Sequence, residues 1–243
     1  GFFLSAVSGL SIWVKNSRTL LGILLCLIVV LAVGGFRRNK VWANEVTLWQ
    51  DNIKETPNKA RVNANLGRTY GALGRYGEAG YYLSRAIKIK PDYAKAFYNR
   101  GFIYAKQGML LQAIADLDQA IKIRPNYAQA YNNRGTFYIR QGDFNQAMAD
   151  FNQAIEINSN DAEAYYNRGC AYAQKGNYSQ EILDLSRAIF INPNFAQAYY
   201  QRALVYYQLR EYDKAWVDLH KAEELGRVIN PQLISALKKV CGI

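Results

Sequence analysis

The sequence predicts an all-α protein in which a solenoid of paired helices follows a transmembrane helix. Three observations support this fold class. Residues 19–36 are uncharged and apolar, a pattern of small and aromatic residues then recurs every 34 residues, and prolines close several of the recurring units. Helix pairs that recur at a fixed period stack on their neighbours and bury a continuous core.

The composition excludes several classes of protein. The 243 residues carry a formal net charge of +11, are 50% hydrophobic and 20% charged, and include three cysteines and one histidine. This excludes a disordered chain, and three cysteines without CxxC spacing exclude a disulfide scaffold. The single histidine, His220, excludes a two-histidine metal site, and the sequence has no HExxH, GxSxG or phosphate-binding glycine motif. We therefore predict no catalytic residue, no metal and no cofactor for this chain.

The first predicted element is a transmembrane helix over residues 19–36. These residues would span about 27 Å as an α-helix, which nearly crosses the hydrocarbon core of a bilayer. A buried globular helix is the alternative, but such a helix usually presents a polar face, and this stretch has none. The uncharged residues 1–14 are predicted to be the end of an earlier apolar span. Basic residues flank residues 19–36 on both sides, so charge leaves the orientation undecided.

The 34-residue period divides most of the remaining chain into five repeats, at 60–93, 94–127, 128–161, 162–195 and 196–229. Each repeat has a small residue at its eighth position and a tyrosine at its eleventh. The small residues are Gly67, Gly101, Gly135, Gly169 and Ala203, and the tyrosines are Tyr70, Tyr104, Tyr138, Tyr172 and Tyr206. Small residues at a fixed place in each repeat indicate where two helices touch.

Partial repeats flank the array at both ends. Pro57 lies 34 residues before Pro91, so residues 43–59 are predicted to form a degenerate half repeat. Residues 230–243 are predicted to form a capping helix and tail, which would cover the exposed apolar end of the stack.

The recurring glycines, tyrosines, alanines and prolines together resemble the tetratricopeptide repeat. This resemblance implies two antiparallel helices per repeat and a right-handed helical solenoid. It also implies that the first helices line a concave groove, in which a protein or an extended peptide binds. We therefore expect a protein or peptide partner.

Charged pairs recur with the same period. Four repeats have an arginine at the seventh position and an aspartate sixteen residues later, whereas the first repeat has Leu66 and Tyr82 and lacks both partners. The four pairs are Arg100 with Asp116, Arg134 with Asp150, Arg168 with Asp184, and Arg202 with Asp218. Because both partners are lost together, we predict a salt bridge between the two helices of a repeat. A row of ligand-binding arginines is the alternative.

The candidate binding residues lie at one phase of the first helices. Amides recur at the sixth position, tyrosines precede several of them, and two basic residues follow near the helix ends. The predicted peptide-binding set is Asn65, Asn99, Asn133, Asn167, Gln201, Tyr98, Tyr166, Tyr200, Lys106 and Arg140. An amide offers a donor and an acceptor, so a row of amides can bind an extended backbone without contacting its side chains. The alternative is that these amides bind water or helix ends.

Positive charge is concentrated toward the N-terminus. The first two repeats have net charges of +4 and +3, whereas the last three have −2, 0 and 0. A basic N-terminal region would be attracted to anionic lipid head groups, so we expect a membrane partner. Because the distal repeats are neutral or acidic and no run of lysine and arginine occurs, we expect no nucleic-acid partner.

A second resemblance concerns residues 37–67, which include Trp42, Trp49, Asn65 and Gly67. This junction resembles that of transmembrane and tetratricopeptide repeat-containing, O-mannosyltransferase-like membrane proteins. The resemblance implies an integral membrane protein with its repeats in a periplasm or lumen. It also implies that the chain is a membrane-anchored scaffold, the partner- or acceptor-recruiting C-terminal region of a glycosyltransferase-like polytopic membrane protein whose active site would lie upstream. The alternative is a membrane-tethered assembly adaptor that faces the cytosol and has no link to glycosylation.

Overall fold

The computed structural model describes residues 22–24, 27–28, 31 and 44–241. Over residues 44–241 the chain folds into twelve α-helices and contains no strand, which confirms the predicted all-α class. The helices are α3 (Glu45–Glu55), α4 (Ala60–Ala72), α5 (Tyr76–Ile89), α6 (Ala94–Lys106), α7 (Leu110–Ile123), α8 (Ala128–Gln141), α9 (Phe144–Ile157), α10 (Ala162–Gln174), α11 (Tyr178–Ile191), α12 (Ala196–Gln208), α13 (Tyr212–Glu224) and α14 (Pro231–Cys241).

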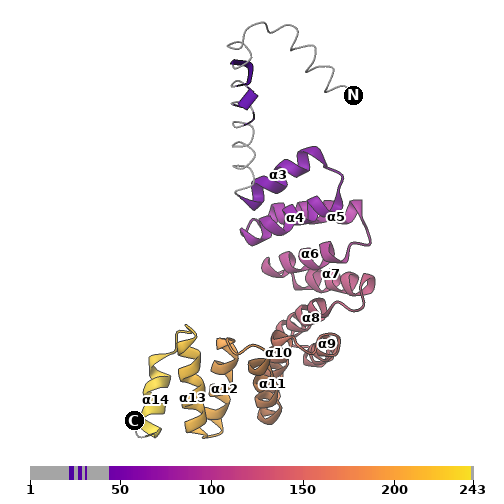
Figure 1. Cartoon of the computed structure of the whole chain (residues 1–243). Helices are drawn as coiled ribbons and strands as arrows, with labels where there is room; N and C mark the ends of the chain where they lie inside the picture. The colour runs from indigo at the N-terminus through magenta and orange to yellow at the C-terminus, as the bar shows by residue number, and fades with distance from the viewer. Residues whose placement is uncertain (1–21, 25–26, 29–30, 32–43, 242–243) are drawn as a thin grey trace.

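Helices α4 to α13 form five pairs that stack in chain order (Figure 1). Each helix packs most extensively on its partner, and the second helix of each pair packs next on the first helix of the following pair. The stack bends, and α4, α6 and α8 lie toward the inside of the bend, while α5, α7 and α9 lie toward the outside. Stacking of each unit on its neighbours alone is the arrangement of a solenoid. We call the face formed by the first helices of the pairs, α4, α6, α8, α10 and α12, the inner face.

Glycine forms the turn inside four of the pairs. Gly74, Gly108, Gly142 and Gly176 have φ angles between 69° and 84°, a left-handed conformation that glycine adopts without steric cost. Arg210 occupies the same place in the last pair with a φ of 61°. The turn geometry is therefore kept even where the glycine is absent.

The two helices of a pair approach closely at the recurring small residue of the first helix. A Cβ atom at Gly67 would lie 2.7 Å from Leu83 Cγ, and one at Gly135 would lie 2.8 Å from Phe151 Cε1. These distances are well inside the normal separation of two carbon atoms. Leu83 and Phe151 are at most 1% exposed, so this approach lies at the centre of the core.

The predicted salt bridges between paired helices are confirmed. Nε and Nη2 of Arg100 on α6 each donate to one carboxylate oxygen of Asp116 on α7, at 2.8 Å, and these hydrogen bonds raise the pKa of Arg100. The same two-point contact joins Arg134 to Asp150, Arg168 to Asp184, and Arg202 to Asp218. All four aspartates are buried, so each carboxylate is stabilised by its arginine.

Each arginine also contacts the preceding pair, which the sequence pattern did not indicate. Nη1 of Arg100 donates to Oγ of Ser84 on α5 at 3.0 Å. The equivalent contacts are Arg134 to Asp118, Arg168 to Asn152, and Arg202 to Ser186. Each arginine therefore links three helices: its own helix, the second helix of its pair and the second helix of the preceding pair.

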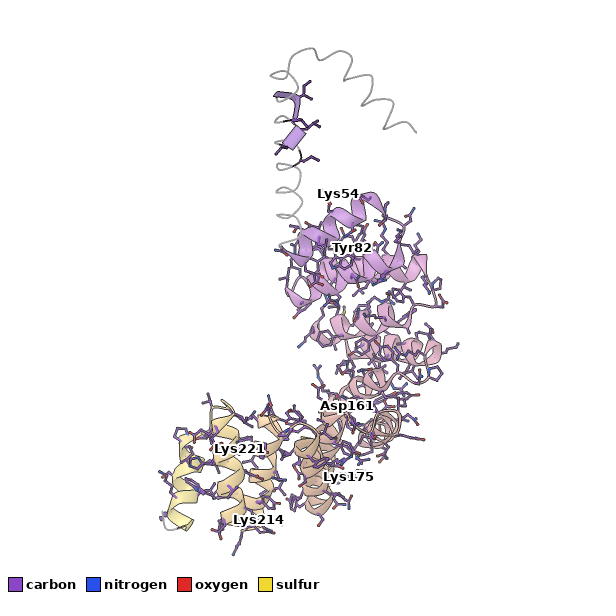
Figure 2. The ribbon with its side chains drawn as sticks, in the orientation of Figure 1. Lys54, Tyr82, Asp161, Lys175, Lys214 and Lys221 are labelled. Carbon is purple, nitrogen blue, oxygen red and sulfur yellow. The ribbon has the colours of Figure 1, made fainter. Side chains whose placement is uncertain are left out.

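The first pair is built without this ionic contact. Leu66 takes the place of the arginine and is fully buried. Tyr82 takes the place of the aspartate (Figure 2) and stacks on Tyr70, with the ring centroids 5.6 Å apart. The N-terminal pair thus uses apolar packing where the later pairs use a buried ion pair.

Helices at both ends cover the stack. Val46, Trp49 and Ile53 of α3 pack against the core of the first pair. Leu237 of α14 is 1% exposed and packs with the core residues of α12 and α13. The apolar ends of the array are therefore shielded from water.

The predicted membrane localisation is wrong. Among the residues that the structure describes, no helix combines the length and the apolar character needed to cross a bilayer. Helices α3 to α14 have 11 to 14 residues, whereas a spanning helix needs about 20 apolar residues. The predicted span end at residues 1–14 and most of the predicted helix over residues 19–36 lie outside the described residues. This finding corrects the prediction of an integral membrane protein with exoplasmic repeats.

Candidate functional site

The predicted binding residues all lie on the first helices of the pairs. The amides and tyrosines are half-buried, and Lys106 and Arg140 are exposed. They occupy α4 (Asn65), α6 (Tyr98, Asn99, Lys106), α8 (Asn133, Arg140), α10 (Tyr166, Asn167) and α12 (Tyr200, Gln201). Because these helices follow one another along the inner face, the set forms a row (Figure 1).

Two amides in the middle of the row are held by the first helix of the preceding pair. Nδ2 of Asn133 donates to Oη of Tyr98 at 3.0 Å, and Nδ2 of Asn167 donates to Oδ1 of Asn132 at 3.0 Å. Within residues 44–241, no group donates to Oδ1 of Asn133 or Asn167. Their amide oxygens are therefore free to accept hydrogen bonds from another molecule.

The last amide of the row contacts a buried carboxyl group instead. Nε2 of Gln201 donates to Oε1 of Glu181 on α11 at 2.9 Å. Glu181 is 0% exposed, its Oε2 has no hydrogen-bond partner, and burial raises its pKa. The corresponding residue of every other repeat is an alanine, at Ala79, Ala113, Ala147 and Ala215. Sequence reasoning missed Glu181, although this break in the alanine series was a usable signal.

Two titratable groups of α10 lie near this carboxyl group. Burial raises the pKa of Cys170 to about 11, and the charge of Glu181 adds to the effect. Burial also raises the pKa of Tyr166. Both groups are therefore neutral at physiological pH and act as polar, uncharged parts of the inner face.

The tyrosines of the predicted set are partly engaged by other rings and cations. The ring of Tyr98 lies 5.0 Å from that of Tyr127, and the ring of Tyr166 lies 5.1 Å from that of Phe195. The guanidinium of Arg227 lies 4.1 Å from the centroid of the Tyr200 ring. These contacts fix the ring orientations, so the tyrosines form preformed walls of the inner face.

A cavity of about 250 Å³ opens on the inner face between α4 and α6. Two predicted residues, Tyr98 and Asn99, line this N-terminal cavity, together with residues that sequence reasoning missed. The missed residues are Arg68, Gly71, Ala72, Phe102 and Ile103. Gly71 carried a usable signal, because the same position holds Ala105, Ile139, Ala173 and Tyr207 in the later repeats.

Within the described part of the chain, no group of three or more His, Cys, Asp or Glu side chains is placed to hold a metal ion. The side chains of the inner face include amides, phenols, apolar groups and a few cations. Such groups bind through hydrogen bonds, apolar contact and charge.

Sequence models of the tetratricopeptide repeat match most of the helical array. The model described as a TPR repeat matches residues 67–108, 137–176 and 169–209. Models described as a tetratricopeptide repeat match residues 94–127, 117–149 and 196–225. The resemblance of the repeats is therefore confirmed. No comparison supports the resemblance of residues 37–67 to O-mannosyltransferase-like membrane proteins.

Solved structures of similar fold include MamA, with 25% identity and a TM-score of 0.59 over 66% of this chain and 94% of that protein. YrrB, described as a TPR protein with an unusual peptide-binding site, has 21% identity and a TM-score of 0.59 over 79% and 97%. PilF of Pseudomonas aeruginosa has 20% identity and a TM-score of 0.71 over 75% and 84%. A comparison with curated proteins finds no match.

Proposed function

We propose that this chain, which belongs to the tetratricopeptide repeat family, is a scaffold that binds a protein partner through an extended segment along its inner face. The observation that carries this proposal is the row of half-buried amides on successive first helices. The amide oxygens of Asn133 and Asn167 are unpaired within the described residues, while an N–H group of each amide is held by the first helix of the preceding pair.

The spacing of the row suits an extended backbone. Packed helices lie about 8–10 Å apart, and three residues of extended chain span about 10 Å. Successive amides can therefore bind backbone groups that are about three residues apart in a partner. Because the Asn133 and Asn167 side chains are already oriented, little side-chain entropy is lost on binding.

The chemistry of the inner face favours binding over catalysis. The repeat fold is typically a non-catalytic scaffold, and YrrB, which shares the fold, is described as having a peptide-binding site. The link to a glycosyltransferase depended on residues 37–67 and has no support from the comparisons, so the proposed scaffold includes no role in glycosylation.

The proposal is tested with peptides selected from a random displayed library on the immobilised protein. We expect the triple variant Asn99→Ala, Asn133→Ala, Asn167→Ala to bind the selected peptides at least about tenfold more weakly, because each lost hydrogen bond contributes about 1 kcal/mol. Fluorescence anisotropy measures the affinity, and circular dichroism checks that helix content is kept.

A matched control removes three exposed amides from the second helices, in the variant Gln112→Ala, Gln119→Ala, Gln146→Ala. The control variant should bind the selected peptides with the same affinity as the parent protein. Equal affinity of the parent and the inner-face variant, or failure to select any peptide, would contradict the proposed function.

A further inference from the structure

We propose that the N-terminal cavity between α4 and α6 binds one apolar side chain of an acidic partner segment. This inference rests on the proposed function, because it assigns a ligand chemistry to one part of the inner face. It is carried by the shape of the cavity, by the apolar groups in its wall and by the cations beside it.

The cavity has room for a single side chain. Its volume is about 250 Å³, below the range of about 300–1,000 Å³ that is usual for small-molecule sites. Phe102 in its wall is 43% exposed, so a leucine or phenylalanine side chain entering the cavity would remove apolar surface of both partners from water.

Gly71 gives this cavity its form. A Cβ atom at Gly71 would lie 2.6 Å from Cδ1 of Ile103, so only glycine allows α4 and α6 this arrangement without a shift of Ile103. The later repeats have alanine, isoleucine or tyrosine at the same position. The later repeats therefore carry a larger side chain where the wall of this cavity has only glycine.

The charge beside the cavity favours an acidic ligand. Arg68 lines the cavity, and Nζ of Lys106 lies 5.2 Å from the centroid of the Phe102 ring. Among the described residues Lys106 has no ion pair, and the pairing of Arg68 with Glu45 joins two half-exposed side chains that a ligand carboxylate can separate. The two repeats that form the cavity carry net charges of +4 and +3.

Asn99 connects the cavity to the amide row. It lines the cavity, and no group of residues 44–241 forms a hydrogen bond with its side chain. Its amide can bind the backbone of the segment whose side chain fills the cavity. The expected ligand is therefore an extended acidic segment with a leucine or phenylalanine at the cavity and carboxylates close to Arg68 and Lys106.

Three synthetic peptides of twelve residues test this inference on the full chain. The first has one central leucine among glutamates and alanines, the second has serine in place of the leucine, and the third has lysines in place of the glutamates. We expect the first peptide to bind at least about tenfold more tightly than either of the others. The serine peptide loses the burial of a leucine, and the lysine peptide loses the pairing of the flanking charges. Fluorescence anisotropy at low and high salt measures the affinities.

Two variants locate the binding. Gly71→Ile, which introduces the residue found at this position in α8, should reduce the affinity for the leucine peptide to that for the serine peptide. Lys106→Gln changes an exposed side chain and should weaken binding of both acidic peptides and lower the salt dependence. The matched control Lys122→Gln removes an exposed lysine from α7 in the same repeat and should leave binding unchanged. Thermal unfolding checks that Gly71→Ile is folded, and Lys106→Gln tests the inference if it is not.

The outcomes separate this inference from the proposed function. If the leucine and serine peptides bind equally, or if none of the three binds at millimolar concentration, the cavity assignment is overturned. Should peptides from the random library still depend on Asn133 and Asn167 in that case, the scaffold function stands without the assignment. If library peptides also fail to bind, both are overturned.

Discussion

The gap between α4 and α6 and the gap between α10 and α12 use the same positions of the repeat, yet they differ in chemistry. The first has Ala79 on its second helix, Asn99 in the amide row and a cavity beside them. The second has Glu181, fully buried, and Gln201, whose longer side chain reaches that carboxyl group at 2.9 Å. Equivalent positions of one repeat pattern thus form a cavity in one gap and a polar contact in the other.

The two ends also differ in how their helices are held together. The first pair uses Leu66 and Tyr82, whereas the later pairs use buried arginine–aspartate contacts. At this contact the arginine and the aspartate are either both present or both replaced. A repeat scaffold can therefore vary its chemistry locally, provided that both members of a contact change.

The largest expected effect comes from placing a carboxyl group at Ala79, the position in the first repeat that corresponds to Glu181. Ala79→Glu should lower the free energy of unfolding by about 3–5 kcal/mol, because Ala79 is 0% exposed and a new carboxylate there has no partner. The second change Asn99→Gln should recover part of the loss. Urea denaturation of the two single variants and the double variant measures the coupling, and additive losses would show that the Glu181–Gln201 contact is not transferable.

The next effect comes from breaking one salt bridge of the later pairs. Asp184→Ala should lower the free energy of unfolding by about 2–3 kcal/mol, because it leaves Arg168, whose side chain is 19% exposed, without its carboxylate. Arg168→Leu with Asp184→Tyr reproduces the residues of the first pair and should cost less than Asp184→Ala alone. Thermal and urea unfolding test the order of these variants, and the reverse order would contradict it.

A smaller, pH-dependent effect is expected at Glu181. Because burial raises its pKa, the folded protein binds this proton more tightly than the unfolded chain, so its stabilising contribution is complete at low pH and is lost as the pH rises through the folded-state pKa. Glu181→Gln should therefore melt a few degrees above the parent at pH 7.5 and level with it at pH 4. A larger gain in melting temperature for Glu181→Gln at pH 4 than at pH 7.5 would contradict the expected pH dependence.

The smallest effect concerns the thiol of Cys170. With its pKa raised to about 11 by burial, Cys170 should react with iodoacetamide at pH 7.5 at least about tenfold more slowly than in the urea-unfolded chain. The measurement uses a background with Cys26→Ser and Cys241→Ser. Glu181→Gln should accelerate the reaction slightly, because the charge of Glu181 raises the pKa of the thiol less than burial does. A rate equal to that of the unfolded chain would show that the thiol is not shielded.

Most of the fold could be predicted because its determinants recur at fixed positions. Gly67 and Gly135 mark the closest approach of paired helices, and the joint loss of arginine and aspartate in the first repeat indicated the salt bridges. The membrane prediction depended on the hydropathy of residues 19–36, most of which lie outside the described residues, and no helix that the structure describes is long and apolar enough to cross a bilayer.

The candidate site could be predicted only in part. The amide row follows from the period, but the period says nothing of the cavity beside Asn99 or of the contact between Gln201 and Glu181. Both depend on Gly71 and Glu181, two residues that break the repeat pattern and therefore do not follow from the period.

The sequence by itself determined the class of the fold, the pairing of its helices and the phase at which the amides recur, because these follow from local periodicity and from side chains that change together. Only the tertiary structure decided which amides are already hydrogen-bonded, where the inner face opens into a cavity and which carboxyl group is buried. These properties depend on distances between helices that belong to different repeats, and close packing sets those distances.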